Sequence, residues 1–171
     1  MTSTLPVMAP APVEDANVNL ACFEVQGQTY ALEVEHLREI VRPQTITPLP
    51  DAPALIEGVV DLRGSVIPVV DLARCLGLAN SDGGHRSRIV IAEFSGLALG
   101  LGVDAATDVL TLASDRLEAL PALATQAGYR SVTHIVRREG ESPVMVISLE
   151  RLIENVAHST RAPRAGEGES R

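Results

Sequence analysis

The sequence contains no lysine and no tryptophan, and it has only two phenylalanines and two tyrosines among 171 residues. A surface that stacks single-stranded nucleic acid needs several exposed rings, and this chain has too few of them. Its 14 basic residues, all arginine, are outnumbered by 22 acidic residues, which gives a formal net charge of −8. Nucleic-acid binding is therefore excluded as a main function, because phosphate contacts require a basic surface.

The chain also lacks a long apolar run and a basic, apolar leader at its N-terminus. We therefore expect neither a membrane-spanning helix nor a signal peptide. Cys22 and Cys75 lie far apart, without a CxxC pair or histidines at metal-ligand spacing. The two cysteines are predicted to be buried free thiols in a cytosolic protein that holds no metal and no cofactor.

Hydrophobic residues make up 46% of the chain, mostly Val, Ile, Leu and Ala, and they follow the two-residue period of β-strands. Hairpins are predicted at residues 22–34, 56–70, 88–103 and 132–147, and single strands at 36–42 and 108–112. Pro68 is expected at a sheet edge or a bulge, since proline cannot donate a ladder hydrogen bond. Short helices are predicted at residues 71–77 and 149–157, each after a capping Asp or Ser.

These elements predict a mostly β protein built from small barrels, with short helices that include a C-terminal one. Residues 1–17, rich in Pro and Ala, are expected to form a disordered arm, and residues 159–171 a disordered tail. The ordered body, residues 18–158, is expected to be one domain of two intertwined barrel subdomains, with sequence halves that divide near residue 80. The halves share an order of elements but no clear sequence identity, so internal duplication stays open.

Three aspartates raise the possibility of catalysis. Asp61, Asp71 and Asp104 could converge as a carboxylate cluster for metal or acid–base chemistry, but each also stands where a strand or helix ends, a common place for Asp. The four histidines share no metal-ligand spacing, and no serine lies in a GxSxG elbow. The sequence therefore gives no positive argument for an enzyme.

A stretch from residue 58 to 72, GVVDLRGSVIPVVDL, is more informative. Gly64 explains a tight turn, but the turn does not require an arginine at position 63. Arg63 at the tip of a rigid hairpin could make bidentate contacts with a partner, or it could be a solvated turn residue. Gly58 could mark a bulge or a place where another backbone approaches closely.

Together, residues 37–40 (LREI), 46–50 (ITPLP) and 56–72 resemble the core signature of the CheW family. The later residues 102–104 with 108–110 resemble the family's second half, and residues 149–152 its final helix. The resemblance covers residues 18 to 155. It implies two five-stranded SH3-like barrels around a shared core, in a protein that is not an enzyme and needs no cofactor.

The resemblance also implies partners. Such adaptors couple chemoreceptors, the methyl-accepting chemotaxis proteins, to a CheA-type histidine kinase, and are recruited from the cytoplasm to receptor arrays. By position, Leu37, Glu39, Gly58 and Arg63 would belong to the surface that takes the receptor's cytoplasmic tip. The barrel edges would contact the kinase regulatory domain and other CheW-like domains in rings, through residues that the sequence does not identify. An adaptor for pili, surface motility or a second messenger is an alternative, and a carboxylate-dependent hydrolase a remote one.

Overall fold

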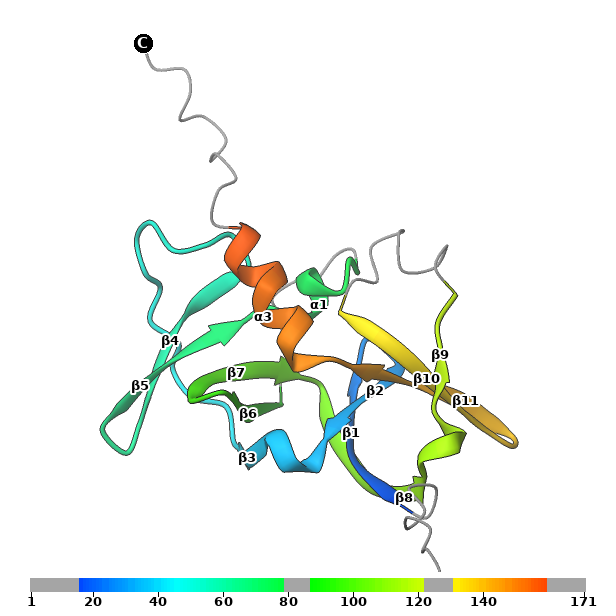
Figure 1. The fold of residues 1–171 in the computed structure, drawn as a ribbon. Coiled ribbons are helices and arrows are strands. Elements are labelled where there is room, and N and C mark those ends of the chain that lie inside the picture. Colours follow the sequence, from blue (N-terminus) through cyan, green and yellow to red (C-terminus); the bar gives the residue numbers. More distant parts are fainter. Residues whose placement is uncertain (1–15, 79–86, 122–130, 160–171) are drawn as a thin grey trace, which may run out of the picture.

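The computed structural model describes residues 16–78, 87–121 and 131–159, which form two curved β-sheets that pack side by side (Figure 1). Six strands lie in the order β8-β1-β2-β11-β10-β9, and five in the order β3-β6-β7-β5-β4. The strands are β1 Asn17–Val25, β2 Gln28–Glu33, β3 Leu37–Val41, β4 Ile56–Leu62, β5 Ser65–Val70, β6 Arg88–Phe94, β7 Leu97–Val103, β8 Ala105–Ala113, β9 Glu118–Ala119, β10 Val132–Arg138 and β11 Glu141–Ile147. The helices are the α-helices α1 Leu72–Cys75 and α3 Leu149–His158 and the 3-10 helices η2 Val34–His36 and η3 Ser114–Arg116.

Three of the hairpins close through a two-residue turn in which both residues have positive φ: Gln26–Gly27, Arg63–Gly64 and Ser95–Gly96. This backbone geometry is that of a type I′ turn, whose twist matches the right-handed twist of the paired strands. A glycine at the second position adopts it without steric cost, which is why the X-Gly pairs in the sequence predict these hairpins.

Each half of the chain runs in the same order: a hairpin, a third strand, a second hairpin and a helix. The third strand does not stay with its own first hairpin. Strand β3 pairs with β6 of the second half, and β8 pairs with β1 of the first half. Each barrel therefore combines strands from both sides of residue 80, and the predicted mostly β fold of two SH3-like barrels is confirmed. The six-stranded barrel gains its extra strand from the two-residue β9.

The apolar side chains form three clusters. One fills the five-stranded barrel around Ile67, Val69 and Ile91, and another fills the six-stranded barrel around Leu20 and Val144. The largest cluster lies between the barrels and takes residues from both sheets and both α-helices. The two barrels therefore pack against each other through one continuous hydrophobic core.

Helix α3 covers the junction of the two barrels (Figure 1). Leu149, Leu152 and Val156 share one helix face and are buried in the shared core. The Ser148 side chain accepts a hydrogen bond from the backbone N–H of Arg151, so the helix begins where the serine predicts it. Burial of Leu152 alone stabilises the fold by roughly 1.5–3 kcal/mol relative to exposure.

Cys22 and Cys75 are buried free thiols, as predicted. Burial raises the pKa of Cys22 from 9.0 to about 11 and that of Cys75 from 9.0 to about 12. We expect neither thiol to react with a disulfide reagent at pH 8 in the folded protein, because the thiolate is the reactive form, and both to react in urea. Rapid labelling in native buffer would contradict this prediction. Because burial raises the pKa of both thiols, the unfolded chain ionises first as the pH rises above 9, and the fold loses stability between pH 9 and about 11–12.

Candidate functional site

Arg63, at the tip of the β4–β5 hairpin, binds Glu39 of β3 with both ends of its guanidinium group. Nη1 donates to Oε2 at 2.9 Å and Nη2 donates to Oε1 at 2.6 Å. The Arg63 hydrogen bonds hold the pKa of Glu39 below its ordinary value of 4.5, so the carboxylate is charged at neutral pH. From the sequence, only the family resemblance assigned Arg63 and Glu39 to one surface. In the structure their side chains are in direct contact.

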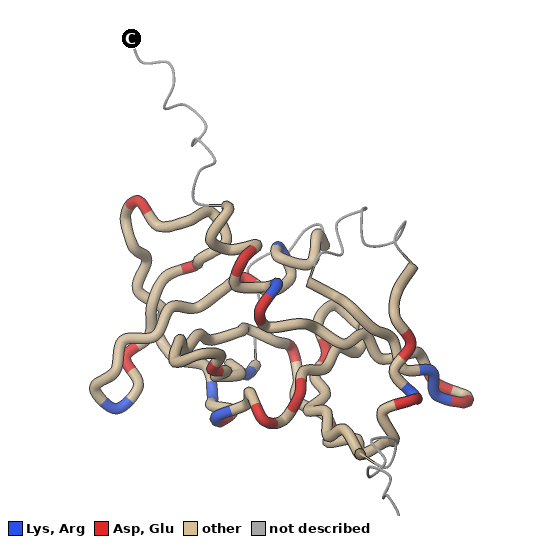
Figure 2. Tube along the Cα trace, in the orientation of Figure 1, with Lys and Arg blue, Asp and Glu red and all other residues tan. Residues whose placement is uncertain are grey.

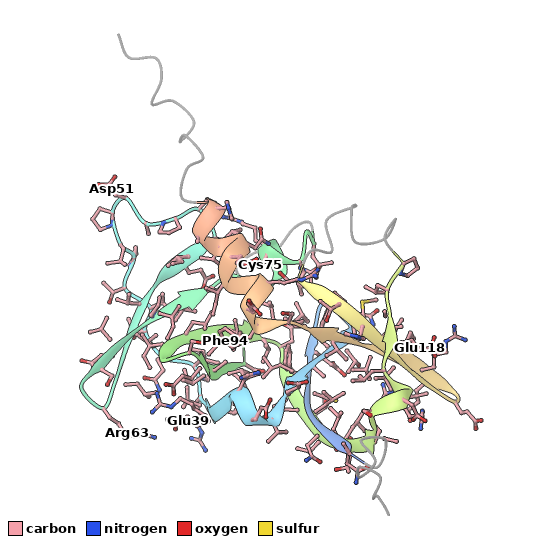
Figure 3. The ribbon with its side chains drawn as sticks, in the orientation of Figure 1. Glu39, Asp51, Arg63, Cys75, Phe94 and Glu118 are labelled. Carbon is pink, nitrogen blue, oxygen red and sulfur yellow. The ribbon has the colours of Figure 1, made fainter. Side chains whose placement is uncertain are left out.

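The ion pair joins the two opposite edges of the five-stranded sheet. Strand β3 is one edge and β4 is the other, and the arginine lies in the turn that follows β4. Figure 3 shows Arg63 and Glu39 at the same end of this barrel. Asp61 Oδ1 accepts a hydrogen bond from the backbone N–H of Gly64 at 3.0 Å, which fixes the turn. The pair therefore holds the hairpin tip against β3.

Most of the arginine nevertheless remains accessible. The Arg63 side chain is 70% exposed, whereas Glu39 is 29% exposed. A guanidinium group carries five N–H donors, and Glu39 accepts from two of them. The remaining donors make no hydrogen bond within residues 16–78, 87–121 and 131–159. The carboxylate thus orients a cation whose free side faces solvent. Figure 2 shows blue, the colour of Lys and Arg, at the tip of the β4–β5 hairpin.

Gly58 is buried under the chain's own backbone. A Cβ atom at this position would lie 2.8 Å from the carbonyl carbon of Thr47 and 2.8 Å from Cγ2 of Ile46, and it would collide with the Thr47 carbonyl oxygen. Thr47 and Val59 exchange two backbone hydrogen bonds of 2.8 Å each. We call residues 43–55, which run across the outer side of β4, the strap. Two roles were open for Gly58, a bulge or a close backbone approach, and both are found. The β4–β5 pairing shifts register between Ile56 and Gly58, and the strap makes the close approach.

A groove of about 640 Å³ lies between the two barrels, beside the first turn of α3. His36 and Phe94 form part of one wall, with ring centroids 5.5 Å apart, and Leu120 and Leu149 contribute apolar surface from the other elements. Leu37 follows His36, is half-buried and packs on the shared core. Of the four residues predicted for the receptor surface, Leu37 is adjacent to the groove, and Glu39 and Arg63 lie together at the barrel end.

Two exposed apolar residues that sequence reasoning missed lie on strands of the same barrel. Leu97 is 49% exposed and pairs across the β6–β7 hairpin with Phe94, which lines the groove. Val66 is 67% exposed and is the second residue after the β4–β5 turn. A large exposed apolar side chain next to a groove, such as Leu97, is typical of a binding surface. One signal for Leu97 was available in the sequence, because the leucines at positions 97, 99 and 101 alternate up to the turn. Val66 had no such signal, since it is out of phase with the buried Ile67 and Val69.

The three aspartates of the hydrolase hypothesis have separate local roles. Asp61 fixes the β4–β5 turn, and Asp71 accepts from the backbone N–H of Arg74 as the N-cap of α1. Asp104 accepts from the backbone N–H of Gln26 at 2.7 Å, at the opposite end of β7 from the groove-lining hairpin turn. Within the described residues, three ligand atoms lie within 4.8 Å of one another only in the partly exposed set Glu33, Glu35 and His36. The aspartates therefore do not form the proposed catalytic cluster.

Comparisons with known proteins agree with this architecture. The family model of the CheW-like domain matches residues 19–157. A chemotaxis protein CheW from Rhizobium meliloti is 35% identical over 106 residues, which cover 62% of this chain and 68% of that protein. A chemotaxis protein CheW from Treponema pallidum is 28% identical over 147 residues, covering 84% and 86%. The crystal structure of a scaffolding protein, TtCheW from Thermoanaerobacter tengcongensis, superposes with a TM-score of 0.73 at 30% identity, covering 81% and 94%.

The structure thus has two barrels with a groove between them, and its three aspartates fix turns and cap a helix. The chain belongs to the CheW-like domain family. It is a chemotaxis adaptor that couples receptors to a CheA-type kinase. None of the helices in the described ranges is long and apolar enough to span a membrane.

Proposed function

We propose that the groove between the barrels holds the helical cytoplasmic tip of a chemoreceptor and that Arg63 sets its register. The observation that supports this proposal most directly is the continuity of apolar surface from Phe94 in the groove to the exposed Leu97 on the next strand. An amphipathic helix inserts its apolar face into such a groove. The guanidinium group, oriented by Glu39, adds a directional polar contact at one end.

The second partner is the regulatory domain of the CheA-type kinase, which binds at barrel edges away from the groove, and other CheW-like domains join the same rings. The protein acts as a scaffold without catalysing a reaction, because its role is to hold receptor and kinase together. It is recruited to receptor arrays at the membrane through these contacts. The arm and tail proposed at residues 1–17 and 159–171 lie almost wholly outside the described residues, and β1 begins at Asn17.

Leu97→Glu tests the groove. We expect the substitution to weaken binding to a purified receptor signalling fragment by at least about tenfold, because it places a charge where an apolar partner surface must be desolvated. Receptor-stimulated kinase phosphorylation should fall in parallel. Binding would be measured by calorimetry with the full chain.

Leu49→Glu is the matched control. Leu49 is 44% exposed, close to the 49% of Leu97, but it lies on the strap. This variant should bind the receptor fragment within about twofold of the wild type, because the strap lines no part of the proposed receptor groove. Equal losses in the two variants, or no loss in Leu97→Glu, would place the receptor elsewhere.

A further inference from the structure

The edges of the two sheets are not equally protected. In the five-stranded sheet, the outer side of β4 is bridged by Thr47 of the strap, and the short β3 is joined to the opposite edge by the Glu39–Arg63 pair. In the six-stranded sheet, one edge is the two-residue β9 and the other is the nine-residue β8. Within the described ranges β8 pairs with β1 on one side and with no strand on the other.

Strand β8 carries few of the features that protect a sheet edge. Its sequence, AATDVLTLA, has no proline and no basic residue, and Asp108 is its one charge. Its pairing with β1 shifts register near Ala106 and is regular from Asp108 to Ala113. Val109 is 62% exposed in the middle of the strand. A long apolar edge of this kind is a template for pairing with another strand.

The strand is also complementary to itself. In an antiparallel pair centred on Val109, this residue meets its own copy, Thr107 meets Thr111, and Asp108 meets Leu110. Valine–valine and threonine–threonine pairs are favourable across strands, and no acidic residue lies directly opposite another. A twofold axis perpendicular to the sheet would keep the core-facing side of both sheets, with Leu110 and Leu112, continuous.

We propose that β8 is a self-association edge, where a second copy of this chain adds antiparallel to continue the six-stranded sheet. The contact is isologous and centred on Val109. It leaves the groove and Arg63 accessible, since both use other strands. An interface limited to one strand pair is small, so we expect association in the range of roughly tens to hundreds of micromolar.

Sedimentation equilibrium of the full chain tests the proposal. The average mass of the wild type should rise from one chain towards two between about 10 µM and 1 mM, and Val109→Lys should stay at one chain because it sets like charges face to face. Far-UV circular dichroism checks that this variant is folded. A wild type that stays at one chain overturns the proposal, as does a Val109→Lys variant that still associates.

Cross-linking gives an independent test that needs no disruptive change. Directly opposite residues in an antiparallel pair have Cα atoms about 4.5–5.5 Å apart, within disulfide range. Val109→Cys should therefore form a disulfide-linked dimer under mild oxidation. Val66→Cys, whose parent residue is 67% exposed on the other barrel, should do so at least about tenfold more slowly. Equal rates would show collisional cross-linking and overturn the proposal.

Discussion

Replacement of Arg63 with alanine should remove most receptor-dependent activation of the kinase, by tenfold or more, while the protein stays folded. Arg63 is exposed, so its removal opens no cavity, and surface ion pairs contribute little to stability. The oriented guanidinium group is instead the polar anchor of the proposed receptor contact. Kinase phosphorylation would be measured with receptor-containing membranes at matched adaptor concentrations, and folding by urea denaturation.

A charge exchange separates a partner contact from a purely internal role. The double variant Arg63→Glu with Glu39→Arg can re-form an ion pair between β3 and the hairpin tip, but it reverses the charge presented by the tip. We expect its urea midpoint to match the wild type and its kinase activation to remain as low as that of Arg63→Ala. Restored activation would show that the pair serves only to close the barrel and that Arg63 makes no receptor contact.

Local chemistry explains how much of the fold could be predicted. The X-Gly pairs predict the tight hairpins because glycine supplies the positive φ that a type I′ turn requires. The serine before the apolar stripe of Leu149, Leu152 and Val156 predicts where α3 begins. These signals depend on residues a few positions apart, and the structure confirms them.

Long-range features could not be predicted in the same way. The exchange of β3 and β8 between barrels depends on how strands pair across the whole chain, which no local pattern encodes. Pro68 shows the limit: it lies on β5, an interior strand in the sheet order, but in a part of β5 where only the β4 side is paired. The ladder from β5 to β7 begins only at Val69, so β5 behaves as an edge strand beside the proline.

In the candidate site, too, local features could be predicted from the sequence and long-range contacts could not. A turn arginine was recognisable as unexplained, but its partner Glu39 lies 24 residues away on the opposite sheet edge. A bulge or a close backbone approach was expected at Gly58, but the sequence did not identify Thr47 as the neighbour. The exposure of Leu97 depends on where the groove opens, a property of packed elements and not of the strand itself.

Gly58→Ala should destabilise the protein by roughly 2–5 kcal/mol, the sum of a steric clash in a packed region and the loss of one or two backbone hydrogen bonds. The new Cβ would meet the Thr47 backbone, which is fixed by its paired hydrogen bonds with Val59. The strap must move away from β4 to make room. The free energy of unfolding would be measured by urea denaturation with intrinsic tyrosine fluorescence or circular dichroism.

Gly64→Ala is the control that separates the clash from backbone conformation. Gly64 has a φ of +86°, but a Cβ there would meet no atom within 4 Å. Its substitution should therefore cost only about 1–2 kcal/mol, the penalty of a left-handed backbone. If Gly58→Ala cost less than Gly64→Ala, the strap would be free to move and could not protect the β4 edge. If Gly58→Ala lowers the free energy of unfolding more than Gly64→Ala does, the close approach of the strap requires a glycine at position 58. A loss of receptor coupling in Gly58→Ala would then follow from displacement of residues 43–55.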